Sequence, residues 1–177
     1  RNRIGLISAA SLTGGAEWIT VKEFRIRGVD GLKSRFQRSK AEKAWTGAGA
    51  LVEREIGTPS PVVFYEERSS GRVLRSAYLS EYLEGVTEIR ELLRTFTGDR
   101  LHNLIVNLSR FLARCHRKNI LHRDLSDGNI LVRHPDSIDP EFFLIDTNRI
   151  RIKKIGRRCG IKNSIRLGIP KSEQKAF

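Results

Sequence analysis

The sequence predicts an α+β fold in which a small antiparallel sheet with one helix precedes a mainly helical part. Two observations predict this order: apolar-rich runs separated by turn residues fill the first 84 residues, and a long amphipathic helix follows from Arg100. At 177 residues, 39% of them apolar, the chain can bury one core and has room for one domain or two small lobes.

Two apolar-rich runs open the chain, Arg3–Leu12 and Glu17–Arg25. Thr13-Gly14-Gly15 between them supplies the permissive backbone of a hairpin turn, so we expect two paired strands. Because side chains alternate along a strand, Lys22 in WITVKEF rises from the middle of the second strand, on the face shared by Trp18 and Phe24.

A helix is predicted from Ser39 to about Glu55, because Ser39 followed three residues later by Glu42 is a capping-box pattern. Gly57 and the prolines at 59 and 61 end it. Two strands follow, Val62–Glu66 and Leu74–Tyr82, around the turn Ser69-Ser70-Gly71.

The long helix is identified by apolar residues at three- and four-residue steps, a spacing that places them on one helical face. They are Leu101, Leu104, Ile105, Leu108, Phe111, Leu112 and Cys115. After this helix we expect a short apolar pair at Ile120, a polar loop from His122 to Gly128, and strands at Ile130–Val132 and Phe142–Ile145.

Composition bounds the partners and the compartment. The 33 Lys and Arg residues outnumber the 20 Asp and Glu residues, and the net charge of +13 favours an anionic partner: nucleic acid, an acidic membrane surface or a phosphorylated substrate. A basic but solvated surface is the alternative. Cys115 and Cys159 form neither a metal spacing nor a disulfide framework, which favours a reducing cytoplasm.

The chain reads as a soluble globular protein of which both ends are truncated. No apolar run approaches the about 18–20 residues of a membrane-spanning helix, and the start lacks the layout of a signal peptide. The sequence begins at Arg1, contains no Met, and ends in KSEQKAF, which reads as the first turn of an unfinished helix.

The segment HRDLSDGNILV carries the residues with the clearest chemistry. Asp124 and Asn129 lie five residues apart in a loop between the long helix and a short strand, and Asp146 ends the next strand in FFLIDTN. Phosphoryl transfer needs one carboxylate to orient the attacking hydroxyl, and an amide and a second carboxylate to hold Mg²⁺. Alternatively, these are ordinary turn-forming residues and His122 is a loop histidine.

The order of these features resembles the protein-kinase-like superfamily, a two-lobed fold with ATP and Mg²⁺ as cofactors. The resemblance implies that Asp124 is the catalytic base, that Asn129 and Asp146 are Mg²⁺ ligands, and that His122 is structural. It also implies that Lys22 contacts the nucleotide α- and β-phosphates.

The superfamily pairs this lysine with a glutamate of the following helix, for which Glu42 is the best candidate, although its capping-box position offers a competing structural role. Glu53 and Glu55 are weaker candidates. The resemblance further implies that the hinge closing the last strand, with Glu81 and Leu83, binds the adenine through its backbone.

Two departures from protein kinases narrow the family. Ser126 stands where Ser/Thr protein kinases usually have Lys, and Asp146-Thr147-Asn148 lacks the Phe and Gly of their magnesium motif. The segments RSKAEKAW, IGTPSPVVFYEER, YLSEYLEG and FFLIDTNRIRI instead resemble the bacterial lipopolysaccharide core kinases, which phosphorylate Kdo or heptose sugars.

This resemblance covers roughly residues 17–167 and implies an N-lobe at 1–84 and an incomplete C-lobe at 85–177. It implies that the first strand and the Gly-rich loop are missing from the N-lobe. From Arg149 to Pro170 the chain carries eight cations and no acid, a stretch that borders the acceptor site in kinase-like folds. Arg149, Arg157 and Arg158 are its candidate acceptor-binding residues, and a solvated basic helix end is the alternative.

We therefore expect a cytoplasmic phosphotransferase with an alcohol group as acceptor, which transfers the γ-phosphoryl group of ATP to a sugar hydroxyl of the lipopolysaccharide inner core. The expected partners are ATP, a lipopolysaccharide core or lipid A-Kdo acceptor, and an anionic membrane surface contacted peripherally; nucleic acid is not expected. Two alternatives are a RIO-like atypical protein Ser/Thr kinase and a non-catalytic kinase-like module that binds anionic surfaces.

Overall fold

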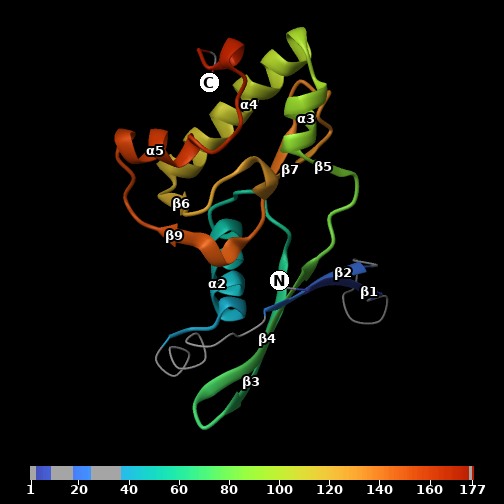
Figure 1. Ribbon diagram of the computed structural model, residues 1–177, viewed down its shortest axis with the longest axis vertical. Helices are drawn as coiled ribbons and strands as arrows, with labels where there is room; N and C mark the ends of the chain where they lie inside the picture. The colour runs from blue at the N-terminus through green and yellow to red at the C-terminus, as the bar shows by residue number, and fades with distance from the viewer. Residues whose placement is uncertain (1–2, 9–17, 25–36, 176) are drawn as a thin grey trace.

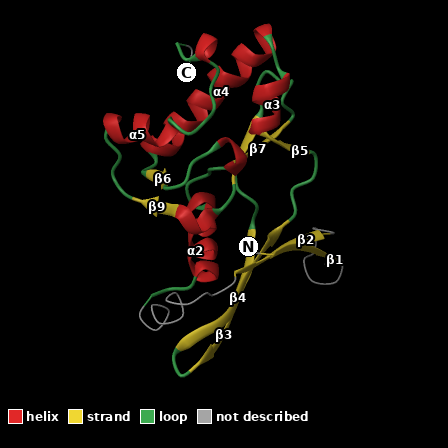
Figure 2. Cartoon of the chain, in the orientation of Figure 1, coloured by secondary structure: helices red, strands yellow, loops and turns green. Residues whose placement is uncertain are grey.

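A computed structural model describes residues 3–8, 18–24, 37–175 and 177. The turn predicted at Thr13-Gly14-Gly15 lies outside the described residues. Within them, the fold is the predicted α+β arrangement, with an antiparallel sheet in the first part and helices concentrated in the second (Figure 1; Figure 2).

The first sheet contains β1 (Arg3–Ser8), β2 (Trp18–Phe24), β3 (Pro61–Ser69) and β4 (Arg72–Glu81). Its order is β1-β2-β4-β3, and every neighbouring pair is antiparallel. Ser70 and Gly71, at the tip of the β3–β4 hairpin, both have positive φ, of 47° and 78°. Two successive positive φ values are the geometry of a type I′ turn, which matches the twist of the strands it joins.

Helix α2 (Lys40–Val52) packs against this sheet. Ser39 is its N-cap, and the Ser39 side chain accepts a hydrogen bond from the backbone N–H of Glu42 at 3.0 Å, as the sequence predicts. Small side chains on its buried face let the helix approach the strands closely. Ala41, Ala44 and Ala48 form a cluster with Phe24 and Tyr78.

The second part begins with β5 (Val86–Glu88), α3 (Ile89–Thr95) and the long helix α4 (Gly98–Arg117). The buried positions of α4 include six of the seven predicted stripe residues, and the seventh, Phe111, is partly buried against the same cluster. Leu51 and Ile56, from the end of α2 and just beyond it, belong to this core as well, so one apolar core joins α2 to the helical part.

Short elements follow α4, and they contain or flank the predicted site residues Asp124, Asn129 and Asp146. They are β6 (Ile120–His122), η1 (Asp127–Asn129), β7 (Ile130–Arg133), β8 (Glu141–Leu144), η2 (Thr147–Arg149), β9 (Ile150–Ile152), α5 (Arg157–Ser164) and η3 (Lys171–Glu173). One small sheet has the order β5-β7-β8, and β6 pairs with β9. In Figure 1, β9 lies beside the upper end of α2, and the chain then runs out to α5 beside α4.

Most elements predicted from the sequence are confirmed, and α4 begins at Gly98 rather than Arg100. Residues 9–12 of the first predicted strand lie outside the described residues. The short helices α3 and α5 and the strand β9 were not predicted. None of the helices in the described part of the chain is both long and apolar enough for a membrane span.

Candidate active site

The loop between β6 and β7 is held in place by hydrogen bonds that involve its predicted site residues. The side-chain amide of Asn129 donates to the backbone carbonyl of Asp124 at 2.8 Å, across the loop. The backbone carbonyl of Asn129 accepts from the N–H of Ile145 at 3.1 Å, the residue just before Asp146. The three residues predicted for phosphoryl transfer therefore belong to one connected unit.

His122 is buried at the base of this loop, with 2% of its surface exposed. Its Nε2 lies 2.9 Å from the carbonyl oxygen of Ile145 and must donate to it, while its Nδ1 accepts from the backbone N–H of Asp124 at 3.3 Å. Burial lowers the pKa of His122. The neutral ring, protonated on Nε2, satisfies both contacts, which supports the predicted structural role.

Asp146 lies two residues after the end of β8, in the left-handed backbone region, with φ of 58°. This conformation is uncommon for residues other than glycine and asparagine or aspartate, and it marks a sharp change in chain direction. The Asp146 carboxylate forms an ion pair with the ammonium of Lys22 on β2. The fold thus brings together two predicted site residues that lie 124 positions apart.

Helix α2 fixes the backbone next to Asp146. The buried hydroxyl of Thr147 donates to the carbonyl of Ala44 at 2.8 Å. A β-carbon added at Gly47 would lie 2.2 Å from the carbonyl oxygen of Thr147, so only glycine allows this approach. On the other side, Thr58 donates to the carbonyl of Leu144 at 2.8 Å.

A cavity of about 280 Å³ lies between the first sheet and the segment around Asp146. Lys22, Asp146, Glu81 and Leu83 all line it, so four predicted site residues share one cavity. Its walls are largely apolar and include Ile4, Ala44, Val86, Leu131 and Ile145. Tyr78 also lines the cavity, and burial raises its pKa to about 12, so its hydroxyl stays protonated at neutral pH.

The hinge after β4 differs from residue to residue in its backbone hydrogen bonds. The N–H of Glu81 donates to the backbone carbonyl of Ser60 at 2.9 Å, and the N–H of Tyr82 donates to the backbone carbonyl of Trp18 at 3.1 Å. In the described part of the chain, the N–H of Leu83 forms no backbone or side-chain hydrogen bond. Leu83 therefore offers a donor to a ligand in the cavity.

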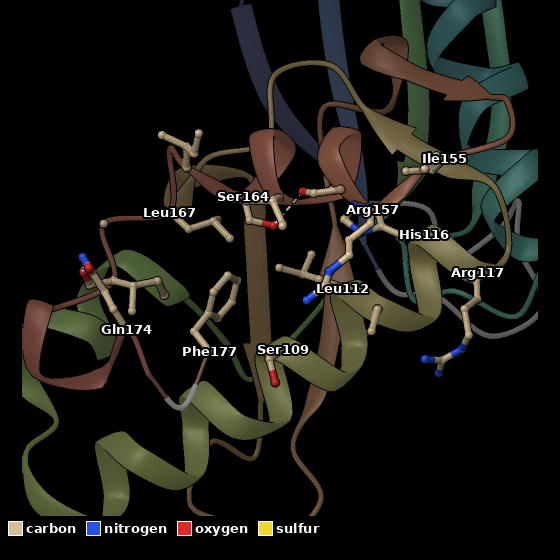
Figure 3. A pocket seen from close by; sticks show the side chains of 17 residues that line it. Ser109, Leu112, His116, Arg117, Ile155, Arg157, Ser164, Leu167, Gln174 and Phe177 are labelled. Carbon is tan, nitrogen blue, oxygen red and sulfur yellow. Dashed lines mark hydrogen bonds between the residues drawn. The ribbon is translucent and has the colours of Figure 1, made fainter.

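Among the predicted acceptor-binding residues, Arg149, Arg157 and Arg158 are exposed. Arg157 lies at the start of α5 and lines a different cavity, of about 770 Å³, between α4, α5 and the last residues of the chain (Figure 3). A different cation of the same stretch, Arg166, contacts the Asp124 carboxylate at 2.5 Å.

The family model of the lipopolysaccharide kinases (Kdo/WaaP) matches residues 29–169. The chain belongs to this family. A solved structure described as WaaP in complex with acyl carrier protein superposes with a TM-score of 0.69 and 19% identity, covering 99% of this chain and 72% of that one, which shows a shared fold. No curated protein sequence matches the chain. Membership of a kinase family makes the protein a phosphotransferase of the lipopolysaccharide pathway.

The glutamate partner expected for the strand lysine is not the one seen in the structure. Glu42 pairs with Arg38 one helical turn away, at 3.2 Å, while Lys22 pairs with Asp146. The physical reason is local: the N-cap at Ser39 places Glu42 in the first turn of α2, where Arg38 is its i,i+4 neighbour. In this structure of the lipopolysaccharide kinase, Glu42 lies outside the Lys22 ion pair.

Three residues near the catalytic loop were missed by the sequence analysis. Arg90 donates from Nε and Nη2 to one oxygen of Asp127, at 3.1 and 2.9 Å. Asn163 on α5 donates to the carbonyl of His122 at 2.7 Å. Arg166 was one of eight cations in a run and could not be singled out. Arg90 and Asn163 carry no sequence signal, because their partners are far along the chain.

Asn129 and Asp146 carry oxygen atoms that could hold a metal ion, and the hydrogen bond from the N–H of Ile145 to the carbonyl of Asn129 connects their backbones. Within the described ranges there is no group of three or more His, Cys, Asp or Glu side chains arranged to hold a metal. A Mg²⁺ ion needs no such group, since it is commonly bound by one or two protein oxygens together with nucleotide phosphates.

Proposed function

We propose that this lipopolysaccharide kinase uses ATP and Mg²⁺ to transfer the γ-phosphoryl group to a sugar hydroxyl, of Kdo or heptose, in the lipopolysaccharide inner core. The observation that carries the proposal is the meeting of Lys22 and Asp146 in a cavity that also contains the hinge. The loop that contains Asp124 is joined by hydrogen bonds of His122 and Asn129 to the backbone of Ile145, the residue before Asp146.

The residues of the cavity fit a nucleotide. Apolar side chains such as Val86 and Leu131 can enclose an adenine ring, and the N–H of Leu83 and the backbone of Glu81 lie at the edge where the ring would be recognised. Lys22 supplies a cation for the α- and β-phosphates. Glu42 pairs with Arg38 in this structure, so it would orient Lys22 only in a different conformation of the protein.

The bound nucleotide and Mg²⁺ would supply the phosphoryl group and neutralise charge on it. For this chain's own part, the Asp146 carboxylate and the Asn129 amide oxygen would hold the metal. Both donors are oxygens, as a hard cation requires. Asp146 would exchange its contact with the Lys22 ammonium for the metal, and Lys22 would turn to the phosphates.

Asp124 is the residue that we assign to the acceptor. Its side chain is 44% exposed, so a sugar hydroxyl can reach it from solvent, and its backbone is fixed by His122 and Asn129. It would accept the proton of the attacking hydroxyl and orient that oxygen toward the phosphoryl group. The neutral His122 ring cannot replace it, because both ring nitrogens are already engaged.

The basic stretch after Asp146 would receive the acceptor. A phosphorylated, Kdo-rich glycolipid is densely anionic, and the exposed residues Arg149, Arg157 and Arg158 provide matching charge. The same charge would draw the protein to an anionic membrane surface. We therefore place its action in the bacterial cytoplasm, in peripheral contact with the inner face of the cytoplasmic membrane.

The test is phosphate transfer by the full-length protein from γ-labelled ATP, with Mg²⁺, to purified Kdo-lipid A and to heptose-containing core lipopolysaccharide. The proposal expects label on a sugar, located by mass spectrometry of the released oligosaccharide. Label recovered as phosphoserine in protein would instead assign a RIO-like protein kinase. A protein that neither binds Mg-ATP nor transfers label would be a non-catalytic module.

A further inference from the structure

We propose that Arg166 is a positioning residue of the acceptor site: it holds the Asp124 carboxylate and binds an anionic group of the acceptor next to the reacting hydroxyl. The inference deepens the proposed function and rests on it. Its basis is the ion pair in which Nη1 of Arg166 lies 2.5 Å from Oδ1 of Asp124, across 42 residues of sequence.

The position of Arg166 is set by the fold on both sides. Three residues before it, Asn163 donates to the carbonyl of His122 at 2.7 Å and ties α5 to the catalytic loop. One residue after it, Leu167 is completely buried in the main core. Gly160 packs against the ring of His116, with an added β-carbon 2.9 Å from the ring, so α5 also lies close on α4. Arg166 therefore starts from an anchored backbone.

The local charge balance gives Arg166 a role that no neighbour fills. In the part of the chain that the structure describes, it is the cation within ion-pair distance of Asp124. Lys22 pairs with Asp146, and Ser126, two residues after Asp124, carries no charge. Without Arg166, the Asp124 carboxylate would face an anionic acceptor without a compensating cation, and like charges repel.

The chemistry of the guanidinium suits a group with planar or tetrahedral oxygens. Arginine has five N–H donors in a fixed fork, and the contact with Asp124 uses one of them. The Arg166 side chain is 65% exposed and that of Asp124 is 44% exposed, so a ligand from solvent can reach the remaining donors next to the carboxylate. A phosphate or carboxylate substituent beside the acceptor hydroxyl is the ligand that this fork fits.

The experiment compares Arg166→Ala and Arg166→Lys in the full-length protein, with Arg94→Ala as the matched control. Arg94 is an exposed arginine in the last turn of α3, so its substitution removes the same charge at a position away from the site. The acceptor is Kdo-lipid A, used both native and after chemical removal of its phosphates. Steady-state constants are measured for ATP and for each acceptor, and thermal unfolding checks the folding of every variant.

We expect Arg166→Ala to raise the KM for the acceptor about tenfold, the size of one lost charge-assisted hydrogen bond, and to leave the KM for ATP within about twofold. Arg166→Lys should recover part of the loss, because it keeps the charge without the fork. If Arg166 binds a phosphate of the acceptor, removing the phosphates should reduce the difference in acceptor KM between the parent and Arg166→Ala. If it binds the Kdo carboxylate, reduction of that carboxylate should reduce the same difference.

Four outcomes would overturn the inference. An unchanged acceptor KM in a folded, active variant removes the acceptor role. A rise confined to the ATP constant assigns Arg166 to the nucleotide phosphates. A parallel loss of melting temperature and of kcat, with both KM values unchanged, assigns a structural role. A parent protein that phosphorylates no acceptor overturns the proposed function and this inference with it, and this result is distinct from the other three.

Discussion

The Lys22 ammonium and the Asp146 carboxylate form an ion pair that joins β2 to the segment just after β8. Both residues line the cavity that Glu81 and Leu83 of the hinge also line. In the proposed function, the pair places a cation for phosphate groups beside a carboxylate for a metal, an arrangement that phosphoryl transfer requires. It also leaves Glu42 with Arg38.

Asp146→Ala should abolish the stabilisation that Mg-ATP gives the protein, because it removes the one charged oxygen ligand beside the neutral Asn129. Thermal unfolding with and without Mg-ATP is the assay. Asp136→Ala is the control, since Asp136 is an exposed carboxylate that also pairs with an arginine, Arg100, but lies outside the cavity. Equal stabilisation of Asp146→Ala and the parent by Mg-ATP would show that Asp146 is not the metal ligand.

His122 should make stability depend on pH in a defined direction. Its pKa in the folded protein is lowered by burial below the ordinary value of 6.5. Between these two values the unfolded chain binds a proton that the folded protein does not, so the free energy of unfolding falls as pH drops below about 6.5, by up to about 1.4 kcal/mol per pH unit. Protonation of Nδ1 would also remove the hydrogen bond from Asp124.

Urea unfolding at several pH values between 5 and 7.5 tests this expectation. His122→Gln should lose less stability on acidification than the parent, because it carries no titratable ring. His134→Asn, which changes an exposed histidine, should follow the parent curve. Identical pH slopes for His122→Gln and the parent would contradict the assigned state of the ring.

Two glycines of α2 should respond in opposite ways to alanine. Gly47→Ala places a β-carbon 2.2 Å from the Thr147 carbonyl oxygen, so α2 must shift away from the segment that carries Asp146. We expect a loss of about 2 kcal/mol or more in the free energy of unfolding. At Gly49 nothing lies within 4 Å of the added atom, and alanine should stabilise the helix by up to about 1 kcal/mol. Chemical denaturation measures both.

A Gly47→Ala variant as stable as Gly49→Ala would show that α2 does not press on the Thr147 backbone. Because both substitutions are Gly→Ala and lie two residues apart on one helix, any difference between the two variants in the free energy of unfolding comes from the surroundings of each position. Nucleotide binding should weaken in Gly47→Ala alone, since Thr147 directly follows Asp146.

Local patterns in the sequence predicted the elements whose signals are local. The Ser39 cap, the stripe of α4 and the strands that flank the catalytic loop are each written in spacing or turn chemistry, and the structure has them. Helix α5 was not predicted, because three of its eight residues are basic and the segment has no apolar period. Strand β9 is three residues long and exists through its pairing with β6.

The residues of the candidate site also divide into those that a local sequence pattern indicates and those that only the folded structure identifies. Asp124, Asn129 and Asp146 could be chosen because their residue types and spacing suit metal-assisted phosphoryl transfer. The partner of Lys22 could not, because several carboxylates were possible and tertiary packing selected Asp146. Arg166 was hidden among eight similar cations, and only the docking of α5 on the catalytic loop distinguishes it. The roles of these residues and the division into lobes at residue 84 remain our proposals.

The central claim is that Asp124 orients a sugar hydroxyl for attack, and the turnover of Asp124→Asn in the full-length protein tests it most directly. The substitution keeps the shape of the side chain and the backbone contacts with His122 and Asn129, and Asp124 does not hold the nucleotide. Transfer of labelled phosphate to Kdo-lipid A should therefore fall by about two to four orders of magnitude while Mg-ATP affinity and melting temperature stay near the parent values. The matched change at an exposed aspartate, Asp139→Asn, should leave turnover intact. Turnover in Asp124→Asn equal to that of the parent would contradict the account.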